Sequence, residues 1–266
     1  MIKRIGWCTD IHLDFVEYSV YREFISAILK AKLDAIFITG DIGNADNVDF
    51  YLQQLCKEIG IPVYFVLGNH DFYQGSIRET RKRISNLCQK TPGLIWVTIK
   101  GVMELTPNTV LLGHDSWADG RLGNYRDSGV MLNDYLHIKE LSNVTKNERL
   151  KRLHKLGDEA ADYVSYFLSR ALENYDHIIF MTHVPPFKEA CLYDGRVAND
   201  DWLPHFSCKA VGDVLYQGML KNRYVDTLVL CGHTHTRAEV DILPNLRVKT
   251  GSAEYGRPVL QEVICL

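Results

Sequence analysis

Five apolar runs in this chain of 266 residues each end in a short polar cluster. The run from Ile61 to Leu67 is followed by Gly68-Asn69-His70-Asp71, where an amide, an imidazole and a carboxylate stand together. The other four clusters are Asp10-Ile11-His12, Gly40-Asp41-Ile42-Gly43-Asn44, Thr182-His183 and Gly232-His233-Thr234-His235. Short apolar runs bounded by turn residues are typical of buried strands. We therefore expect each cluster to lie at the end of a strand.

The spacing of apolar residues near the N-terminus predicts alternating strands and helices. Strands are expected over residues 2–9, 35–38 and 63–67, and apolar residues recur at helical spacing over 21–29 and 48–59. This order predicts a mostly parallel sheet covered by helices. Because ligands of such sheets bind beyond the carboxyl ends of the strands, the first three clusters should meet at one edge.

The rest of the chain predicts a second sheet and a cap within one domain, residues 1–266. Short strands over 95–99, 102–105 and 110–112 indicate antiparallel hairpins. Residues 113–144 lack a periodic pattern, which is typical of a functional loop, and we expect a cap at about 115–145. Further elements are a basic helix over 74–88, a helix over 147–175 with a candidate break at Gly157, a helix over 208–220, and strands over 178–181, 227–231 and 263–265.

Charge and cysteine usage narrow the class of protein. The net charge of -3 gives no global attraction to nucleic acid or membrane. The seven cysteines are odd in number and lack C-x-x-C spacing, so we expect a reducing compartment and a cytoplasmic location. We expect no secretory signal peptide, because the first strand begins at once. No apolar run approaches the ~20 residues that span a bilayer.

Together the clusters carry enough oxygen and nitrogen donors to bind metal ions. Each cluster alone is ordinary, since Gly-Asp after a strand is common turn chemistry and a lone His183 is more often structural. Asp, Asn and His side chains suit Mn, Fe, Zn or Ni, and the absence of Cys from the clusters disfavours a structural zinc site. With one bridging carboxylate, the set could hold two ions roughly 3.5–4 Å apart, as in enzymes of phosphoryl transfer.

The ordered set Asp10-x-His12, Gly40-Asp41, Gly68-Asn69-His70-Asp71, His183 and Gly232-His233-x-His235 resembles the signature of the calcineurin-like metallophosphoesterases. It fills every metal-ligand position of that family in the family's order. The resemblance implies an α/β fold, a four-layer α-β-β-α sandwich of two packed mixed β-sheets flanked by helices, here with an inserted cap. It also implies a metal-dependent phosphoric ester hydrolase.

The resemblance assigns a role to each residue of the set. Asp10, His12 and His235 would hold one metal ion, Asn69, His183 and His233 a second, and Asp41 would bridge them. A metal-bridging hydroxide would attack phosphorus in line, and His70 would protonate the leaving group. His70 needs a partner to hold its ring. The protein-phosphatase branch uses a carboxylate at the position of Asn44, so we expect either Asp71 or Asn44 to be that partner.

The substrate is less constrained. The chain lacks the longer Gly-Asp-x-Val-Asp-Arg-Gly motif of the protein phosphatases and is nearer the bacterial group of cyclic-nucleotide phosphodiesterases and phosphatases. In the cap, Arg121 and Arg126 could grip a phosphate, and Trp117, Tyr125 or Phe187 could stack on a base. For any single one of these residues, we favour a structural or solvated role.

We expect a small phosphoester as substrate, a monoester or a diester, and no nucleic-acid or membrane partner. Two alternatives stay open: a nuclease acting on single-stranded nucleic acid, and a non-catalytic binding scaffold with this fold. The basic stretches over 78–83 and 146–155 would suit a nuclease, but the net charge favours solvated helix faces. The complete set of metal ligands argues against the scaffold. The pattern does not indicate an oligomeric state.

Overall fold

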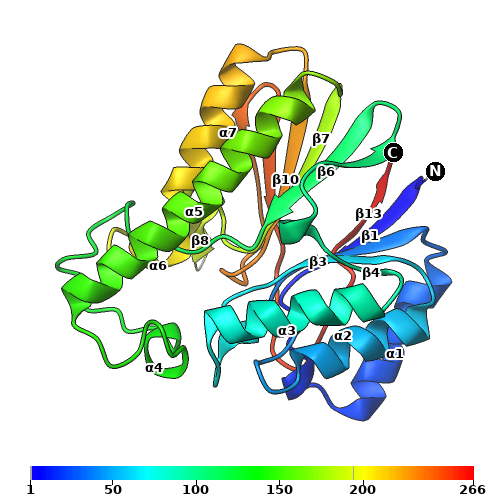
Figure 1. Ribbon diagram of the computed structural model, residues 1–266, viewed down its shortest axis with the longest axis horizontal. Helices are drawn as coiled ribbons and strands as arrows, with labels where there is room; N and C mark the ends of the chain where they lie inside the picture. The colour runs from blue at the N-terminus through cyan, green and yellow to red at the C-terminus, as the bar shows by residue number, and fades with distance from the viewer. Residues whose placement is uncertain (1, 194) are drawn as a thin grey trace.

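The computed structural model describes residues 2–193 and 195–266, in which two large β-sheets pack face to face between layers of helices (Figure 1). One sheet has the strand order β13-β1-β2-β3-β4 and the other β11-β12-β10-β7-β6-β5, with β8 and β9 forming a small hairpin. The expected sandwich of two mixed sheets flanked by helices is confirmed. The strands are β1 (Arg4–Cys8), β2 (Ala35–Thr39), β3 (Val63–Val66), β4 (Leu94–Trp96), β5 (Met103–Thr106), β6 (Thr109–His114), β7 (His177–Thr182), β8 (Leu192–Tyr193), β9 (Arg196–Val197), β10 (Asp226–Cys231), β11 (Ala238–Leu243), β12 (Leu246–Thr250) and β13 (Glu262–Cys265).

The helices fall on the two outer faces. In Figure 1, α1, α2 and α3 cover the sheet that contains β1, and α5 and α7 cover the other sheet. The helices are α1 (Tyr18–Lys30), α2 (Val48–Ile59), α3 (Ile77–Lys90), α4 (Asp134–His137), α5 (Lys146–Leu172), α6 (Leu203–Phe206) and α7 (Lys209–Lys221), with short 3-10 helices η1 (Leu13–Phe15), η2 (His70–Phe72), η3 (Val97–Ile99) and η4 (Lys188–Ala190).

Parallel pairing dominates the interior of both sheets. β1, β2, β3 and β4 pair in parallel, as do β6, β7, β10 and β12. The edge strands β13, β5 and β11 pair antiparallel to their neighbours. Parallel strands are covered on both faces, which is why every residue of β2 is buried. A third apolar core, which includes Trp7, Phe37, Met181 and Leu230, fills the space between the sheets.

Two details differ from the sequence-based prediction. The predicted hairpin strand over 95–99 is instead β4, parallel to β3, followed by η3, and only β5 and β6 of the three predicted strands form a hairpin. The expected break at Gly157 is also wrong, because α5 continues for 27 residues through it. A Cβ at Gly157 would lie 2.6 Å from Cβ of Asp119. The glycine therefore lets a neighbouring loop approach the helix.

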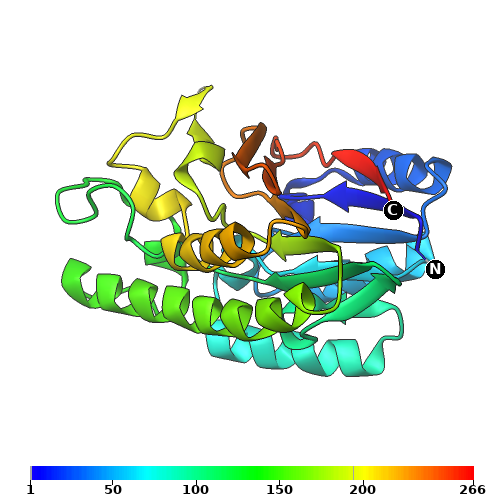
Figure 2. The ribbon, with the colours of Figure 1, turned by 90° about the horizontal axis from the view of Figure 1, so that it is seen from above.

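Two long connections, here named the first and the second insertion, lie beyond the carboxyl ends of the strands. The first insertion, residues 115–145, contains α4, and the second insertion, residues 183–208, contains η4, β8, β9 and α6. In Figure 2 these green and yellow segments lie at the left, toward which the dark-blue arrow of β1 points. They contact each other, since the backbone N–H of Asn124 donates to the carbonyl of Asp200 at 2.7 Å. No helix within residues 2–193 and 195–266 is both long and apolar enough to cross a bilayer.

Candidate metal centre

Five of the seven predicted metal ligands have a left-handed backbone conformation. Such φ values are uncommon outside glycine and cluster at functional sites, where the surrounding structure maintains them. Each of the five lies in the loop that follows a strand, and its left-handed conformation turns the chain sharply at the edge of the sheet. The residues and their φ values are Asp10 (47°), His12 (38°), Asp41 (54°), His233 (72°) and His235 (55°).

Two glycines let the backbone of one loop approach the carboxylate of another. A Cβ at Gly68 would lie 2.1 Å from Oδ1 of Asp41, and a Cβ at Gly232 would lie 2.0 Å from Oδ2 of Asp10. Any other residue would displace these carboxylates. The glycines of the Gly-Asn-His-Asp and Gly-His-x-His clusters are therefore needed for close packing at the site.

A first group of donors consists of Asp10, His12, Asp41 and His235, whose ligand atoms all lie within 4.8 Å of one another. Nε2 of His12 is 3.1 Å from Nε2 of His235, which is 3.3 Å from Oδ1 of Asp10. Two carboxylates and two imidazoles that converge in this way suit a divalent transition-metal ion.

A second group of donors surrounds the amide oxygen of Asn69. Oδ1 of Asn69 lies 2.9 Å from Nε2 of His183 and 2.9 Å from Nδ1 of His233. Asp41 faces both groups with different oxygens: Oδ1 is 3.4 Å from Nε2 of His183, and Oδ2 is 3.8 Å from Nε2 of His12. The seven residues thus form two adjacent groups that share one carboxylate.

The hydrogen bonds around the second group leave two acceptors facing each other. His233 donates its Nε2–H to the carbonyl of His205 at 2.9 Å, so the neutral ring presents a lone pair at Nδ1. Asn69 uses its Nδ2 to donate to Asp134 at 2.8 Å, so its oxygen faces that lone pair. Two acceptors 2.9 Å apart repel each other unless a cation lies beside both. The donor chemistry therefore fits a bound metal ion.

The ionisation of Asp41, the shared carboxylate, also fits a bound metal ion. Burial raises the pKa of Asp41, but the neighbouring His183, His70 and His12 lower it by more. The pKa of Asp41 therefore lies well below its ordinary value. Burial lowers the pKa of His183, but the charge of Asp41 raises it to about 10. Asp41 is thus negatively charged and attracts positive charge. A metal ion that binds His183 would have to displace a proton, which makes binding dependent on pH.

His70 lies beside the first group of donors, between two tyrosines. Its ring stacks on Tyr73 with centroids 4.2 Å apart, and its Nε2 is 3.4 Å from the hydroxyl of Tyr255. Tyr255 is 48% exposed, and its ring also packs on that of His12, with centroids 4.5 Å apart. The sequence reasoning missed Tyr255, because a tyrosine in the loop between β12 and β13 belongs to no recognisable motif.

Within residues 2–193 and 195–266, neither Asp71 nor Asn44, the two predicted partners, forms a hydrogen bond with the imidazole of His70. The carboxylate of Asp71 instead accepts backbone N–H groups of the loops after β2 and β3, including that of Gly68 at 2.8 Å. Asn44 donates its amide to Oδ2 of Asp14 at 3.1 Å. Burial raises the pKa of Asp14, and the hydrogen bond from Asn44 acts in the opposite direction.

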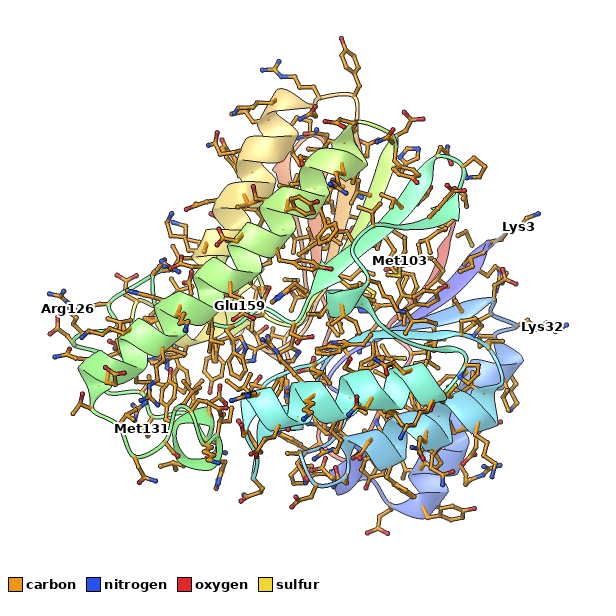
Figure 3. The ribbon with its side chains drawn as sticks, viewed as in Figure 1. Lys3, Lys32, Met103, Arg126, Met131 and Glu159 are labelled. Atoms are coloured by element: carbon orange, nitrogen blue, oxygen red, sulfur yellow. The ribbon has the colours of Figure 1, made fainter. Side chains whose placement is uncertain are left out.

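Three of the five residues considered for substrate binding do not gather at the donors. Trp117 is buried in the core, where its ring lies 5.4 Å from that of Phe72. Arg121 forms ion pairs with Asp119 at 3.0 Å and with Asp158 on α5 at 2.6 Å, which fastens the first insertion to the helix. Arg126 is exposed and lies at the outer end of the molecule (Figure 3). These positions give no support to a substrate role for the three residues, which stays a prediction.

Comparison with known proteins adds three findings. A family model described as calcineurin-like phosphoesterase matches residues 3–237. UDP-2,3-diacylglucosamine hydrolase of Yersinia pseudotuberculosis is 28% identical over 117 residues, which cover 40% of this chain and 45% of the relative. The chain thus spans about half the length of the curated relatives that it matches.

Solved structures share the fold at low identity. Phosphopantetheinyl hydrolase of Mycobacterium tuberculosis has a TM-score of 0.67 at 15% identity, covering 96% of this chain and 91% of that chain. A dimetal phosphatase of Danio rerio has a TM-score of 0.58 at 15% identity, covering 94% of this chain and 88% of that chain. At these identities the likeness concerns the arrangement of sheets and helices.

Proposed function

This chain belongs to the calcineurin-like phosphoesterases, and we propose that it is a metal-dependent phosphoric ester hydrolase that acts on a small phosphoester at a two-metal centre. The observation that carries the proposal is the position of Asp41, whose two carboxylate oxygens face the two groups of donors at 3.4 and 3.8 Å. A carboxylate so placed can bind one ion with each oxygen.

The proposed ligands follow the two groups. Asp41 would bridge the ions, and the other six residues divide between them. When bound, a pair of divalent ions supplies a nucleophile at neutral pH and neutralises the charge that develops on the phosphoryl group. Manganese, iron, zinc and nickel all suit these donors. The first ion would be held by Asp10, His12 and His235, and the second by Asn69, His183 and His233.

His70 is the proposed proton donor. Its Nε2 faces the exposed hydroxyl of Tyr255 rather than the protein interior, so a leaving oxygen at this rim could receive the proton. Tyr73 restrains the ring by stacking.

The relatives inform the choice of substrates to test. One is named for a UDP-linked diacylglucosamine and one for a phosphopantetheinyl group, so diesters and pyrophosphates of small molecules belong beside simple monoesters. We also propose a cytoplasmic location, which rests on the odd number of cysteines and the lack of C-x-x-C spacing.

A substrate screen of the Mn²⁺-loaded chain tests the proposal. The panel contains p-nitrophenyl phosphate, bis-p-nitrophenyl phosphate, cyclic nucleotides, a UDP-sugar and single-stranded DNA. We expect turnover of at least one small phosphoester, its loss on chelation and its recovery with Mn²⁺. Cleavage of DNA alone, with a steep salt dependence, would support the nuclease instead. Absence of turnover with Mn²⁺, Fe²⁺, Ni²⁺ and Zn²⁺ would support a binding scaffold.

A further inference from the structure

The amide of Asn69 is held by the first insertion. Nδ2 of Asn69 donates to Oδ1 of Asp134 at 2.8 Å and to the hydroxyl of Tyr73 at 3.2 Å. The same hydroxyl donates to Oδ1 of Asp134 at 2.6 Å. Asp134 is the first residue of α4 and is only 5% exposed. The three side chains thus form a closed set of hydrogen bonds away from bulk water.

This contact determines which end of the amide faces the donors. A carboxylate accepts hydrogen bonds and cannot donate them, so Asn69 must turn its NH₂ group toward Asp134. The oxygen then points the opposite way, to within 2.9 Å of nitrogens of His183 and His233. A reversed amide would set an oxygen against the carboxylate and present hydrogens where a metal ligand needs a lone pair.

Tyr135, the next residue of α4, is linked through His205 to His233, another ligand of the second group. The hydroxyl of Tyr135 lies 2.5 Å from Nδ1 of His205, and the carbonyl of His205 accepts the Nε2–H of His233. Adjacent residues of one short helix therefore support Asn69 and His233. Within the described part of the chain, no hydrogen bond joins the first insertion to Asp10, His12 or His235.

We propose that Asp134 is a positioning residue for the second metal ion, acting through the orientation of the Asn69 amide. The inference rests on the proposed ligand set and goes beyond it, because it assigns the support of one ion to the first insertion. Outer partners of metal ligands typically change metal affinity about 10- to 100-fold when they are removed. Removal of Asp134 should therefore weaken the binding of the second ion and leave the binding of the first ion unchanged.

Titration of the metal-free full chain with Mn²⁺ tests this inference without an assay of activity. Calorimetry gives the affinity of each ion, and electron paramagnetic resonance distinguishes coupled pairs of Mn²⁺ from isolated ions. For Asp134→Ala we expect about 10- to 100-fold weaker binding of the second ion, unchanged binding of the first, and a signal of isolated Mn²⁺ at intermediate loading. Asp134→Asn keeps an acceptor oxygen and should restore most of the affinity.

Two further variants complete the design. Asp127→Ala removes an exposed acid of the same insertion and is the matched control; it should bind both ions as the unmodified chain does. Tyr73→Phe removes the hydroxyl that joins Asn69 to Asp134, keeps the ring, and should weaken only the second ion. If Asp134→Ala does not fold, Asp134→Leu, which keeps the volume of the side chain and removes both acceptor oxygens, takes its place.

The outcomes separate this inference from the proposed function. Equal binding of both ions by Asp134→Ala and the unmodified chain would overturn the role of Asp134, as would equal weakening of both ions. If the unmodified chain itself binds fewer than two Mn²⁺ ions, the two-metal proposal fails, and the role of Asp134 fails with it.

Discussion

The carboxylate of Asp71 accepts the backbone N–H of Asp41 at 3.1 Å, and it also accepts those of Ile42, Gly43 and Gly68 at 2.8, 2.9 and 2.8 Å. One side chain thus joins the loop that carries the shared carboxylate to the loop that carries Asn69. The distance between the two groups of donors depends on this connection.

We expect Asp71→Asn to destabilise the fold by about 2–4 kcal/mol, because an amide has one acceptor oxygen and turns its own N–H₂ toward backbone donors. Burial and the charge of Asp41 raise the pKa of Asp71 to about 8, so urea unfolding is best measured at about pH 9, where the carboxylate is ionised. The exposed Asp46, changed to Asn, is the matched control. Equal stability of the two variants would contradict the connecting role.

Arg121 should affect stability and leave substrate affinity unchanged. Arg121→Ala leaves Asp119, which is fully buried, without its ion-pair partner, and we expect a loss of about 3 kcal/mol in the free energy of unfolding. The exposed Arg126→Ala should change it by less than about 0.5 kcal/mol. Neither variant should alter KM. A raised KM for Arg121→Ala at unchanged stability would support a substrate role for this residue.

The strand ends could be predicted from the sequence, and the contacts between loops could not. Each polar cluster follows its own apolar run, so parallel topology alone brought Asp10, Asp41 and Asn69 to one edge of the first sheet. His183 and His233 reach the same edge from the second sheet, which the family resemblance implied.

The supporting side chains carry no local pattern. Asp134 lies 65 positions from Asn69 along the chain, and Tyr255 lies 185 positions from His70. Such pairs depend on how two loops fold over the sheets, which neither periodicity nor turn chemistry describes. For the same reason, the sequence left Asp71 and Asn44 as alternative partners of His70, although the carboxylate of Asp71 points to backbone N–H groups.

Asp41 and His70 should separate metal binding from proton transfer. Asp41→Ala removes the shared ligand and should lose both ions. His70→Ala should keep the Mn²⁺ content and lower kcat about 10²- to 10⁴-fold. The loss should be smaller for a nitrophenyl ester than for an alkyl ester, because nitrophenolate leaves without a proton. Metal analysis beside kinetics checks this, and equal loss of metal in both variants would refute the division of roles.

Tyr255 should act on kcat through His70. Tyr255→Phe keeps the ring against His12 and removes the hydroxyl near Nε2 of His70, so we expect unchanged Mn²⁺ content and a decrease in kcat of up to about tenfold. Tyr224, which is 97% exposed, offers the control Tyr224→Phe. A Tyr255→Phe variant with the same kcat as this control would show that the hydroxyl does not serve the reaction.

His114 should make the stability of the metal-free fold depend on pH. Its buried Nδ1 accepts the backbone N–H of Ser116 at 3.0 Å, and burial lowers its pKa to about 4, although Asp115 acts in the opposite direction. The unfolded chain, with an ordinary histidine pKa of about 6.5, therefore binds more protons between these two values. Stability that is complete above pH 6.5 is lost as the pH falls toward 4, by about 3 kcal/mol from this residue.

The variant His114→Asn keeps an acceptor for Ser116 and cannot be protonated in this range. We expect its free energy of unfolding, measured in urea at several values between about pH 4 and pH 7, to fall less steeply than that of the unmodified chain. The exposed His177→Asn is the matched control for loss of a histidine. Parallel curves for His114→Asn and the unmodified chain would mean that His114 takes up a proton in the fold without breaking its contact to Ser116, and the proposed origin of the pH dependence would be wrong.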